Sequence, residues 1–250
     1  MSLNKEHLGM FSRNWLFISE ETQRKLKEKT ILVVGSGLGS RISEIAVRTG
    51  FEKLIVADGD KVELSNLNRQ FFSREDLDHN KAVALKQNLL RINPNCSITA
   101  LPEFLDRVSL LEWIPKADIV VNTIDFDSPA FQVCSDLCRK NEKLELFPTN
   151  LGFGGSVVVS EKGSPTFSEF FGTNDHSVVK QKILEFLMTK ASPYMQDAYY
   201  RYLKTTELPD PQLGIAVAVT SALVVTLMVK YVVGEGLTTF PNDFYYTELG

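Results

Sequence analysis

The stretch that decides the fold is ILVVGSGLGSR, residues 31–41. Its apolar, β-rich start predicts a buried strand over 31–35 that ends in a glycine. Residues 40–49 then carry apolar side chains at helical spacing, which predicts a helix. The turn between them holds three glycines, Gly35, Gly37 and Gly39. The third glycine comes one residue earlier than in the dinucleotide-binding pattern G-x-G-x-x-G, so that Ser40 stands in its place.

Further strand-like segments follow, and they alternate with segments of helical character. The strand-like segments are KLIVAD at 53–58, SITALPE at 97–103 and ADIVVNT at 117–123. Helices are expected over residues 20–29, 75–92 and 129–141. Strands that alternate with helices form parallel βαβ units. We therefore predict an α/β, Rossmann-like fold: a doubly wound, mostly parallel sheet with helices on both faces.

The pattern changes after residue 150. The expected elements are a glycine-rich strand, a helical region, a long apolar helix and a final strand, at 151–160, 176–205, 214–234 and 244–249. We find no linker and no internal repeat that would divide the chain. We therefore expect a single domain over residues 1–250, in which a C-terminal strand and helix elaboration extends the first half.

The composition narrows the class of protein. The 250 residues are 44% hydrophobic and 23% charged, with a net charge of −4, as in an ordinary globular domain. An acidic chain argues against DNA binding and makes RNA an unfavoured partner. Three cysteines, Cys96, Cys134 and Cys138, indicate a reduced, cytoplasmic protein. Cys134 and Cys138 are four residues apart, and we expect core thiols rather than metal ligands because no further ligands cluster with them.

The apolar segment 215–233 raises the question of a membrane span. Lys230 lies near one end of it, and no second segment of this kind exists. A helix buried inside a large α/β domain explains the same composition. The N-terminus carries no apolar signal segment, so we expect no association with a membrane.

The glycine turn and an acidic residue together favour a bound nucleotide. A glycine loop that opens a helix exposes backbone N–H groups to phosphate, and the helix dipole adds positive potential. Asp58 ends the second strand, about 20 residues after the loop, where a carboxylate can accept hydrogen bonds from ribose hydroxyls.

The segment DGDKVELSNLNRQFF, residues 58–72, is dense in acids and amides and carries one arginine. Lys81 follows at the start of the next helix. One interpretation of this segment is a solvated loop with a helix cap, but SNLNRQ directly after the ribose-type Asp58 is a specific string. Asp60 is expected to order this loop.

These motifs resemble the ThiF/MoeB/HesA superfamily, the bacterial relatives of ubiquitin-activating enzymes. The resemblance extends over most of the chain, and SNLNRQ is its most specific string. It further includes the lead-in FSRNWLFISEETQRKLKEKTILVVG, RINPN at 91–95, VVNTIDFD at 120–127, the glycines at 152–155 and the apolar helix at 214–234.

The resemblance implies an enzyme that binds ATP and Mg²⁺ and adenylates a carboxylate, typically the C-terminal glycine of a ubiquitin-like or sulfur-carrier protein. It assigns about 30–150 to nucleotide binding and about 151–250 to crossover and partner docking. It implies catalytic roles for Arg13, Arg69, Lys81 and Asp125. The residues implied to contact the nucleotide are Gly35, Gly37, Gly39, Asp58, Ser65, Asn66, Arg69 and Lys81.

Two of these implied roles concern the metal and the neighbouring subunit. Asp125 would hold the Mg²⁺ ion. Arg13 resembles the family's arginine finger, which reaches into the neighbouring site and so implies a homodimer. The chemistry agrees with this set, because a carboxylate that attacks ATP needs positive charge around the phosphates rather than a general base.

The chain departs from the family pattern in four respects. The glycine loop is one residue shorter than G-x-G-G-x-G, which places Arg41 in the first helical turn, where we expect it to face solvent. No cysteine follows Cys138, which excludes the family's Cys₄ zinc site. For the same reason no conventional catalytic cysteine exists in the second half. Residues 161–212 are rich in aromatic side chains, which could form a docking surface or fill the core.

Three other interpretations remain open. The first is an enzyme that resembles the tRNA threonylcarbamoyladenosine dehydratases, which adenylate a carboxylate on a tRNA base. The second is a non-catalytic relative that binds a nucleotide and a partner, which the shortened loop would favour. The third is an NAD-linked oxidoreductase, which accounts for the glycines and Asp58 but not for SNLNRQ.

Overall fold

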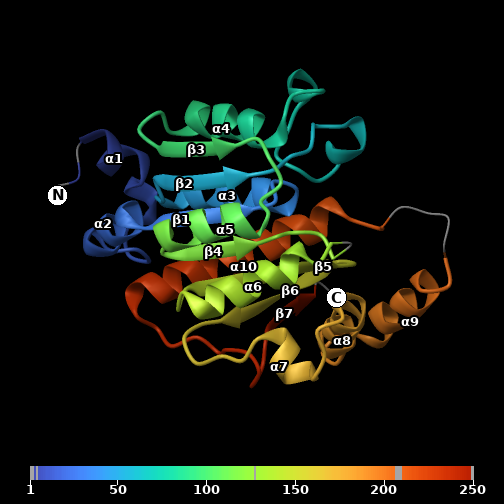
Figure 1. The fold of residues 1–250 in the computed structure, drawn as a ribbon. Helices are drawn as coiled ribbons and strands as arrows, with labels where there is room; N and C mark the ends of the chain where they lie inside the picture. The colour runs from blue at the N-terminus through green and yellow to red at the C-terminus, as the bar shows by residue number, and fades with distance from the viewer. Residues whose placement is uncertain (1–2, 4, 127, 206–209, 249–250) are drawn as a thin grey trace.

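The computed structural model describes residue 3 and residues 5–126, 128–205 and 210–248. A sheet occupies its centre, and helices cover both faces (Figure 1). The strands are β1 (Thr30–Val34), β2 (Lys53–Ala57), β3 (Ser97–Leu101), β4 (Ile119–Asn122), β5 (Leu144–Leu151), β6 (Gly154–Ser160) and β7 (Tyr245–Glu248). The helices of ordinary α type are α1 (Lys5–Met10), α2 (Glu20–Glu28), α3 (Leu38–Thr49), α4 (Lys81–Ile92), α5 (Arg107–Trp113), α6 (Ala130–Lys140), α7 (Phe167–Phe171), α8 (His176–Met188), α9 (Pro193–Tyr202) and α10 (Gly214–Val233).

The strand order is β3-β2-β1-β4-β5-β6-β7. Strands β1 to β5 pair in parallel, whereas β6 and β7 are antiparallel additions. The chain leaves β1 toward β2 and later returns to place β4 on the other side of β1, so the topological switch lies between β1 and β4. Ligands of open α/β sheets bind beyond the carboxyl ends of the strands at such a switch. The predicted doubly wound, mostly parallel sheet is confirmed.

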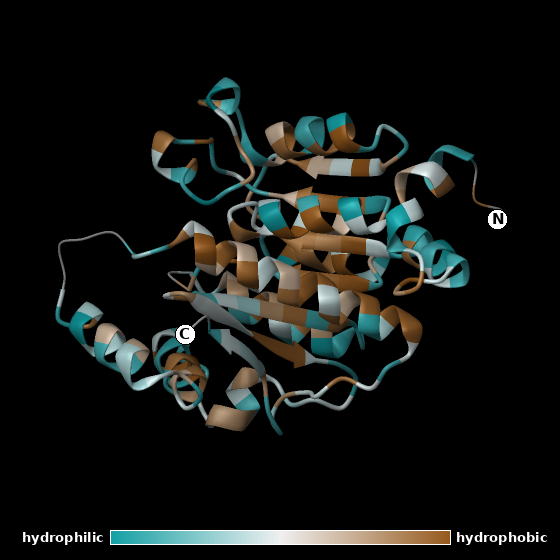
Figure 2. Cartoon of the chain, turned by 180° about the vertical axis from the view of Figure 1, so that it is seen from behind, coloured by the Kyte–Doolittle hydropathy of each residue, from teal (hydrophilic) through white to brown (hydrophobic). Residues whose placement is uncertain are grey.

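The central strands bury side chains on both faces because helices cover both. Ile31 and Val33 of β1 face a cluster that contains residues of α3, α4 and α10. Leu32 and Val34 face the opposite cluster, formed with α5 and α6. Figure 2 shows hydrophobic residues concentrated in the strands at the centre of the sheet. This two-sided burial explains why β1 is a continuous apolar run rather than an alternating one.

Two expectations about local structure need correction. The helix expected over 75–92 begins only at Lys81, because Asn80 caps it with its side-chain oxygen, which accepts from the Val83 N–H at 3.2 Å. The region 176–205 is two helices, α8 and α9, since Ser192 and Pro193 start a new one. The sequence interpretation also missed β5 and α5.

Strand β5 was missed because it contains Pro148 and the charged Glu145. Its parallel pairing with β4 ends at Leu146, so Pro148 lies beyond that ladder. A proline is tolerated there because its missing N–H removes no hydrogen bond to β4. The final predicted strand is confirmed as β7, although Leu249 lies outside the described residues.

Helix α10 is long and apolar enough to cross a membrane by length and composition, with a mean hydropathy of 2.1. In the fold it packs against α3, β5 and β6. Val224, Leu227 and Met228 are buried in the same cluster as β1. This packing favours the interpretation of α10 as a core helix.

The aromatic side chains of the expected docking region divide between the core and the surface. Phe167 is buried, and its ring centroid lies 5.3 Å from that of Phe240. Phe186 packs against the same ring at 6.0 Å. Tyr194 and Tyr200 of α9 are exposed. Core filling therefore accounts for only part of this aromatic composition, since Phe170 is exposed as well.

Candidate functional site

The glycine turn lies at the carboxyl end of β1, beside the ends of β2 and β4. Gly35 adopts φ +96°, and a Cβ atom there would lie 2.6 Å from the Thr123 carbonyl oxygen. A Cβ on Gly39 would lie 2.5 Å from Val33 Cγ1, so this glycine allows α3 to pack closely on β1. Close packing of helix and strand is the part played by the third glycine of dinucleotide-binding turns. The shortened turn therefore keeps this packing although its third glycine comes early.

Ser40 has a structural part that the motif did not reveal. Its hydroxyl donates to the Gly37 carbonyl at 2.7 Å and accepts from the Phe71 N–H at 2.9 Å. The serine thus fastens the glycine turn to the segment 58–72. Arg41 lies beside it, over the Phe71 ring at 5.6 Å, and pairs with Glu44 at 2.8 Å. The expectation that Arg41 simply faces solvent is therefore only partly right.

We expect Gly35→Ala to destabilise the fold by about 2–4 kcal/mol, because the left-handed backbone and the clash with Thr123 act together. Gly163→Ala is a matched control, since Gly163 also has a positive φ of 89° but has no atom within 4 Å of an added Cβ. The control should lose only about 1–2 kcal/mol. Urea unfolding of both variants measures the difference. Equal losses would contradict the close approach of Thr123.

Asp58 directly follows β2 and is only 7% exposed. One carboxylate oxygen accepts from the Ser36 N–H at 2.6 Å, and the other accepts from the Asp60 N–H at 2.8 Å. Burial raises the pKa of Asp58, while the charge of Lys81 and these two hydrogen bonds oppose the rise. Asp58 therefore holds the glycine turn against the next loop, in the place from which a ribose could also be bound.

Lys81 brings a buried positive charge to the same edge. It is 8% exposed, and its Nζ donates to an Asp60 carboxylate oxygen at 2.9 Å. Its own N–H donates to the Asp60 carbonyl at 2.8 Å. Asp60 thus orders this loop, as expected from the sequence, and aims Lys81 toward Asp58.

The side chain of Arg69 is held by three hydrogen bonds. Its Nε donates to Gln212 Oε1 at 2.6 Å, and its Nη1 donates to the Ser65 carbonyl and to Asn68 Oδ1, both at 2.9 Å. Ser65 therefore takes part through its backbone. Asn66 is buried, and its side-chain oxygen caps the short turn by accepting from the Glu63 N–H at 3.0 Å. In the described structure Asn66 shapes the loop that presents Arg69.

Asp125 is exposed beyond the end of β4. Burial lowers the pKa of Arg69, and the charge of Asp125 opposes this shift, so the two groups act on each other. Thr123 connects this region to the glycine turn, because its hydroxyl donates to the Gly35 carbonyl at 2.7 Å. An exposed carboxylate beside a glycine turn of this kind suits Mg²⁺, which binds one or two carboxylates together with phosphate oxygens. Asp127, the last residue of the predicted string 120–127, lies outside the described residues.

Arg13 is not brought to this site within the chain. It lies in the short exposed turn Ser12–Asn14. The neighbouring Asn14 donates to the carbonyl of Thr49, the last residue of α3, whereas the glycine turn adjoins the first. A helix of this length spans about 18 Å. The structure thus assembles Arg69, Lys81, Asp58 and Asp125 at the carboxyl edge of the sheet. Arg13 lies near the opposite end of α3.

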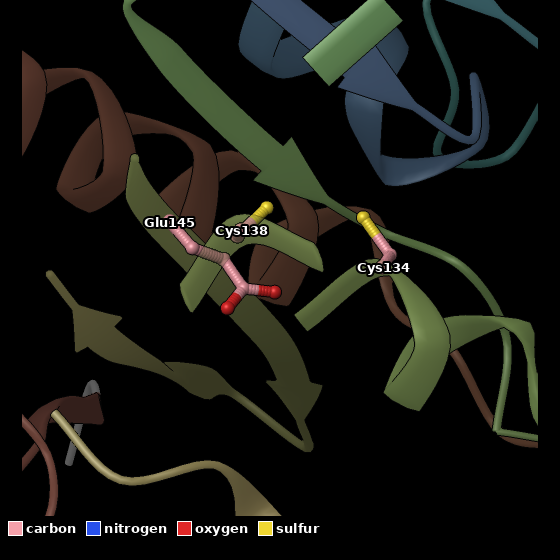
Figure 3. A group of neighbouring side chains, drawn as sticks. All are labelled: Cys134, Cys138 and Glu145. Atoms are coloured by element: carbon pink, nitrogen blue, oxygen red, sulfur yellow. The ribbon is translucent and has the colours of Figure 1, made fainter. Parts of the chain in front are cut away.

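The two neighbouring cysteines lie with Glu145 between α6 and β5 (Figure 3). Their sulfur atoms and a carboxylate oxygen lie within 4.8 Å of one another, and all three residues are buried. A hydrogen bond with Cys134 and burial raise the pKa of Cys138, which favours a neutral thiol. Glu145 is already satisfied by Ser135 at 2.6 Å and Arg139 at 3.2 Å. This chemistry fits core thiols better than metal ligands.

The chain matches known proteins in sequence and in fold. Residues 11–249 match the model of the ThiF family. The sulfur carrier protein ThiS adenylyltransferase of Escherichia coli is 31% identical over 161 residues, which cover 63% of this chain and 64% of that protein. A probable molybdopterin-synthase adenylyltransferase of Porphyra purpurea is 30% identical over 156 residues, 61% of this chain and 41% of that protein. The match thus spans less than two thirds of these relatives.

Solved structures share the fold. The crystal structure of PaaA aligns with a TM-score of 0.71 at 18% identity and covers 98% of this chain and 84% of PaaA. The structure of E. coli MccB with ATP aligns with a TM-score of 0.69 at 18% identity, over 99% of this chain and 74% of MccB.

Proposed function

Because the chain belongs to the ThiF family, we propose that it is an ATP-dependent adenylyltransferase that activates a carboxylate. The proposed substrate is the C-terminal glycine of a ubiquitin-like or sulfur-carrier protein. The observation that carries this proposal is the placement of Arg69, Lys81 and Asp125 around the glycine turn at the β1–β4 switch. The named relatives, which are adenylyltransferases, support it.

The proposed reaction is the attack of the substrate carboxylate on the α-phosphorus of ATP. A new oxygen–phosphorus bond forms, and the bond to the pyrophosphate leaving group breaks. The carboxylate is already ionised at neutral pH, so the residues must offset negative charge rather than remove a proton. The protein groups proposed for this are Arg69, Lys81 and the N–H groups at the start of α3.

Mg²⁺ fits the site through Asp125 and would neutralise charge on the phosphates when bound. Asp58 is proposed to bind the ribose, since it follows β2 at the carboxyl edge. The product would be an acyl adenylate. A nucleophile on another molecule would then accept the acyl group, because the sequence carries no cysteine after Cys138.

A homodimer is part of this proposal. Arg13 precedes three consecutive exposed apolar side chains: Trp15, Leu16 and Phe17 are 71%, 78% and 89% exposed. An exposed apolar cluster of this kind favours a protein contact. A second copy that covers it would bring Arg13 to a neighbouring chain.

We further propose a cytoplasmic location, which the three free cysteines support.

The test is ATP–pyrophosphate exchange with purified small proteins that end in glycine, added one at a time. We expect exchange with a matching carrier and none with the same carrier lacking its terminal glycine. Tight ATP binding without exchange for any carrier would instead favour a non-catalytic, nucleotide-binding relative. Exchange supported by tRNA would indicate the dehydratase type, and tighter binding of NAD than of ATP would refute the proposal.

A further inference from the structure

The start of α10 is tied to the loop that carries Arg69. The Asn68 side-chain amide donates to the Gln212 carbonyl at 3.2 Å, and Gln212 Oε1 accepts from Arg69 Nε at 2.6 Å. A Cβ atom on Gly214 would lie 2.7 Å from the Asn68 carbonyl oxygen, so the two backbones approach closely. Both ends of the contact are therefore fixed by the backbone, and the Gln212 side chain is aimed at the guanidinium.

The contact leaves part of Arg69 open to a ligand. The hydrogen bonds that the Arg69 side chain makes with described residues use Nε and Nη1. A guanidinium is planar, so fixing Nε and Nη1 also fixes the direction of Nη2. Nη2 is then available to an anion, and the charge of Asp125, the proposed metal ligand, acts on the same guanidinium.

The chemical type of the group that accepts from Arg69 Nε determines how much positive charge Arg69 presents. A carboxylate at the position of the Gln212 amide would form an ion pair with Arg69 and compete with phosphate for its charge. A neutral amide oxygen accepts the same hydrogen bond and leaves the net positive charge intact. We propose that Gln212 is a positioning residue, which orients Arg69 without neutralising it and so presents a full positive charge to the nucleotide phosphates.

This inference rests on the proposed ATP-binding function. Its test measures the dissociation constant for MgATP by titration calorimetry, alongside exchange kinetics. Gln212→Met keeps the length of the side chain but removes the acceptor, and we expect ATP to bind about tenfold more weakly. Gln212→Glu keeps the acceptor but adds a charge, and we expect a loss at least as large, which shrinks at high salt. Gln181→Met, at an exposed glutamine of α8, is the control.

The same substitutions in an Arg69→Ala background separate positioning from a structural effect. We expect no further loss of ATP affinity there, because Gln212 acts through Arg69. Wild-type ATP affinity in Gln212→Glu, or equal losses in both backgrounds, would overturn the inference. ATP binding without exchange in the unmodified protein would refute the proposed adenylation alone, since the affinities of the variants would still decide the role of Gln212. Absence of ATP binding would overturn both.

Discussion

Arg69→Ala is expected to lower the rate of carrier-dependent ATP–pyrophosphate exchange by about 10³-fold. The variant removes the guanidinium that is proposed to offset charge on the phosphates as the carboxylate attacks. Its fold should persist, because Arg69 lies in a loop at the edge of the sheet and contributes nothing to the apolar clusters. Exchange of labelled pyrophosphate into ATP, with and without the carrier, measures the loss.

The control for this variant is Arg24→Ala. Arg24 is an exposed arginine of α2 that pairs with Glu20 one helical turn away. The Arg24→Ala variant should exchange pyrophosphate at the same rate as the unmodified protein. Circular dichroism and thermal unfolding of both variants should match the parent. Exchange retained by Arg69→Ala would refute the role assigned to this side chain.

Asp125→Asn is expected to reduce exchange by about 10³-fold as well, but for a different reason. The amide keeps the size of the side chain and removes the negative charge that would hold Mg²⁺ beside the phosphates. We therefore expect the Mg²⁺ concentration for half-maximal exchange to rise steeply. Arg69→Ala should leave this metal dependence nearly unchanged, so the two variants should be separable by a magnesium titration.

The matched control is Asp197→Asn, at an exposed aspartate of α9 that pairs with Arg201. It should leave both the exchange rate and the magnesium dependence as they are. If Asp125→Asn shows an unaltered magnesium dependence, a different ligand must hold the metal, and the assignment of Asp125 fails.

The sequence was most informative where local periodicity and burial act together. Strand β1 and helix α3 were foreseen because an apolar run, glycines and a helical pattern stand next to one another in residues 31–49. The side chains at the ends of β2 and β4 could be anticipated for the same reason, since parallel strands end at a common edge. Arg69, Lys81 and Asp125 became candidates only through the resemblance of their strings to a family.

Other structural features could not be predicted from the sequence. Strand β5 contains a proline that lies beyond the end of the β4–β5 ladder, which is a property of the register and not of the residue. Gln212 lies far from Arg69 in sequence, and no local pattern connects them. Ser40 looked like a defect in a fingerprint, and only its contact with Phe71 reveals what it does.

The Ser40 contacts have a consequence for how a nucleotide would bind. A glycine-rich loop normally loses conformational freedom when it closes around phosphate, and this loss weakens binding. Here one hydroxyl links the turn to Phe71, while Asp58 and Thr123 brace it from the two neighbouring strand ends. These hydrogen bonds hold the turn in one conformation before any ligand arrives. The shortened glycine loop is therefore preorganised. Its conformational entropy is lost during folding rather than during binding.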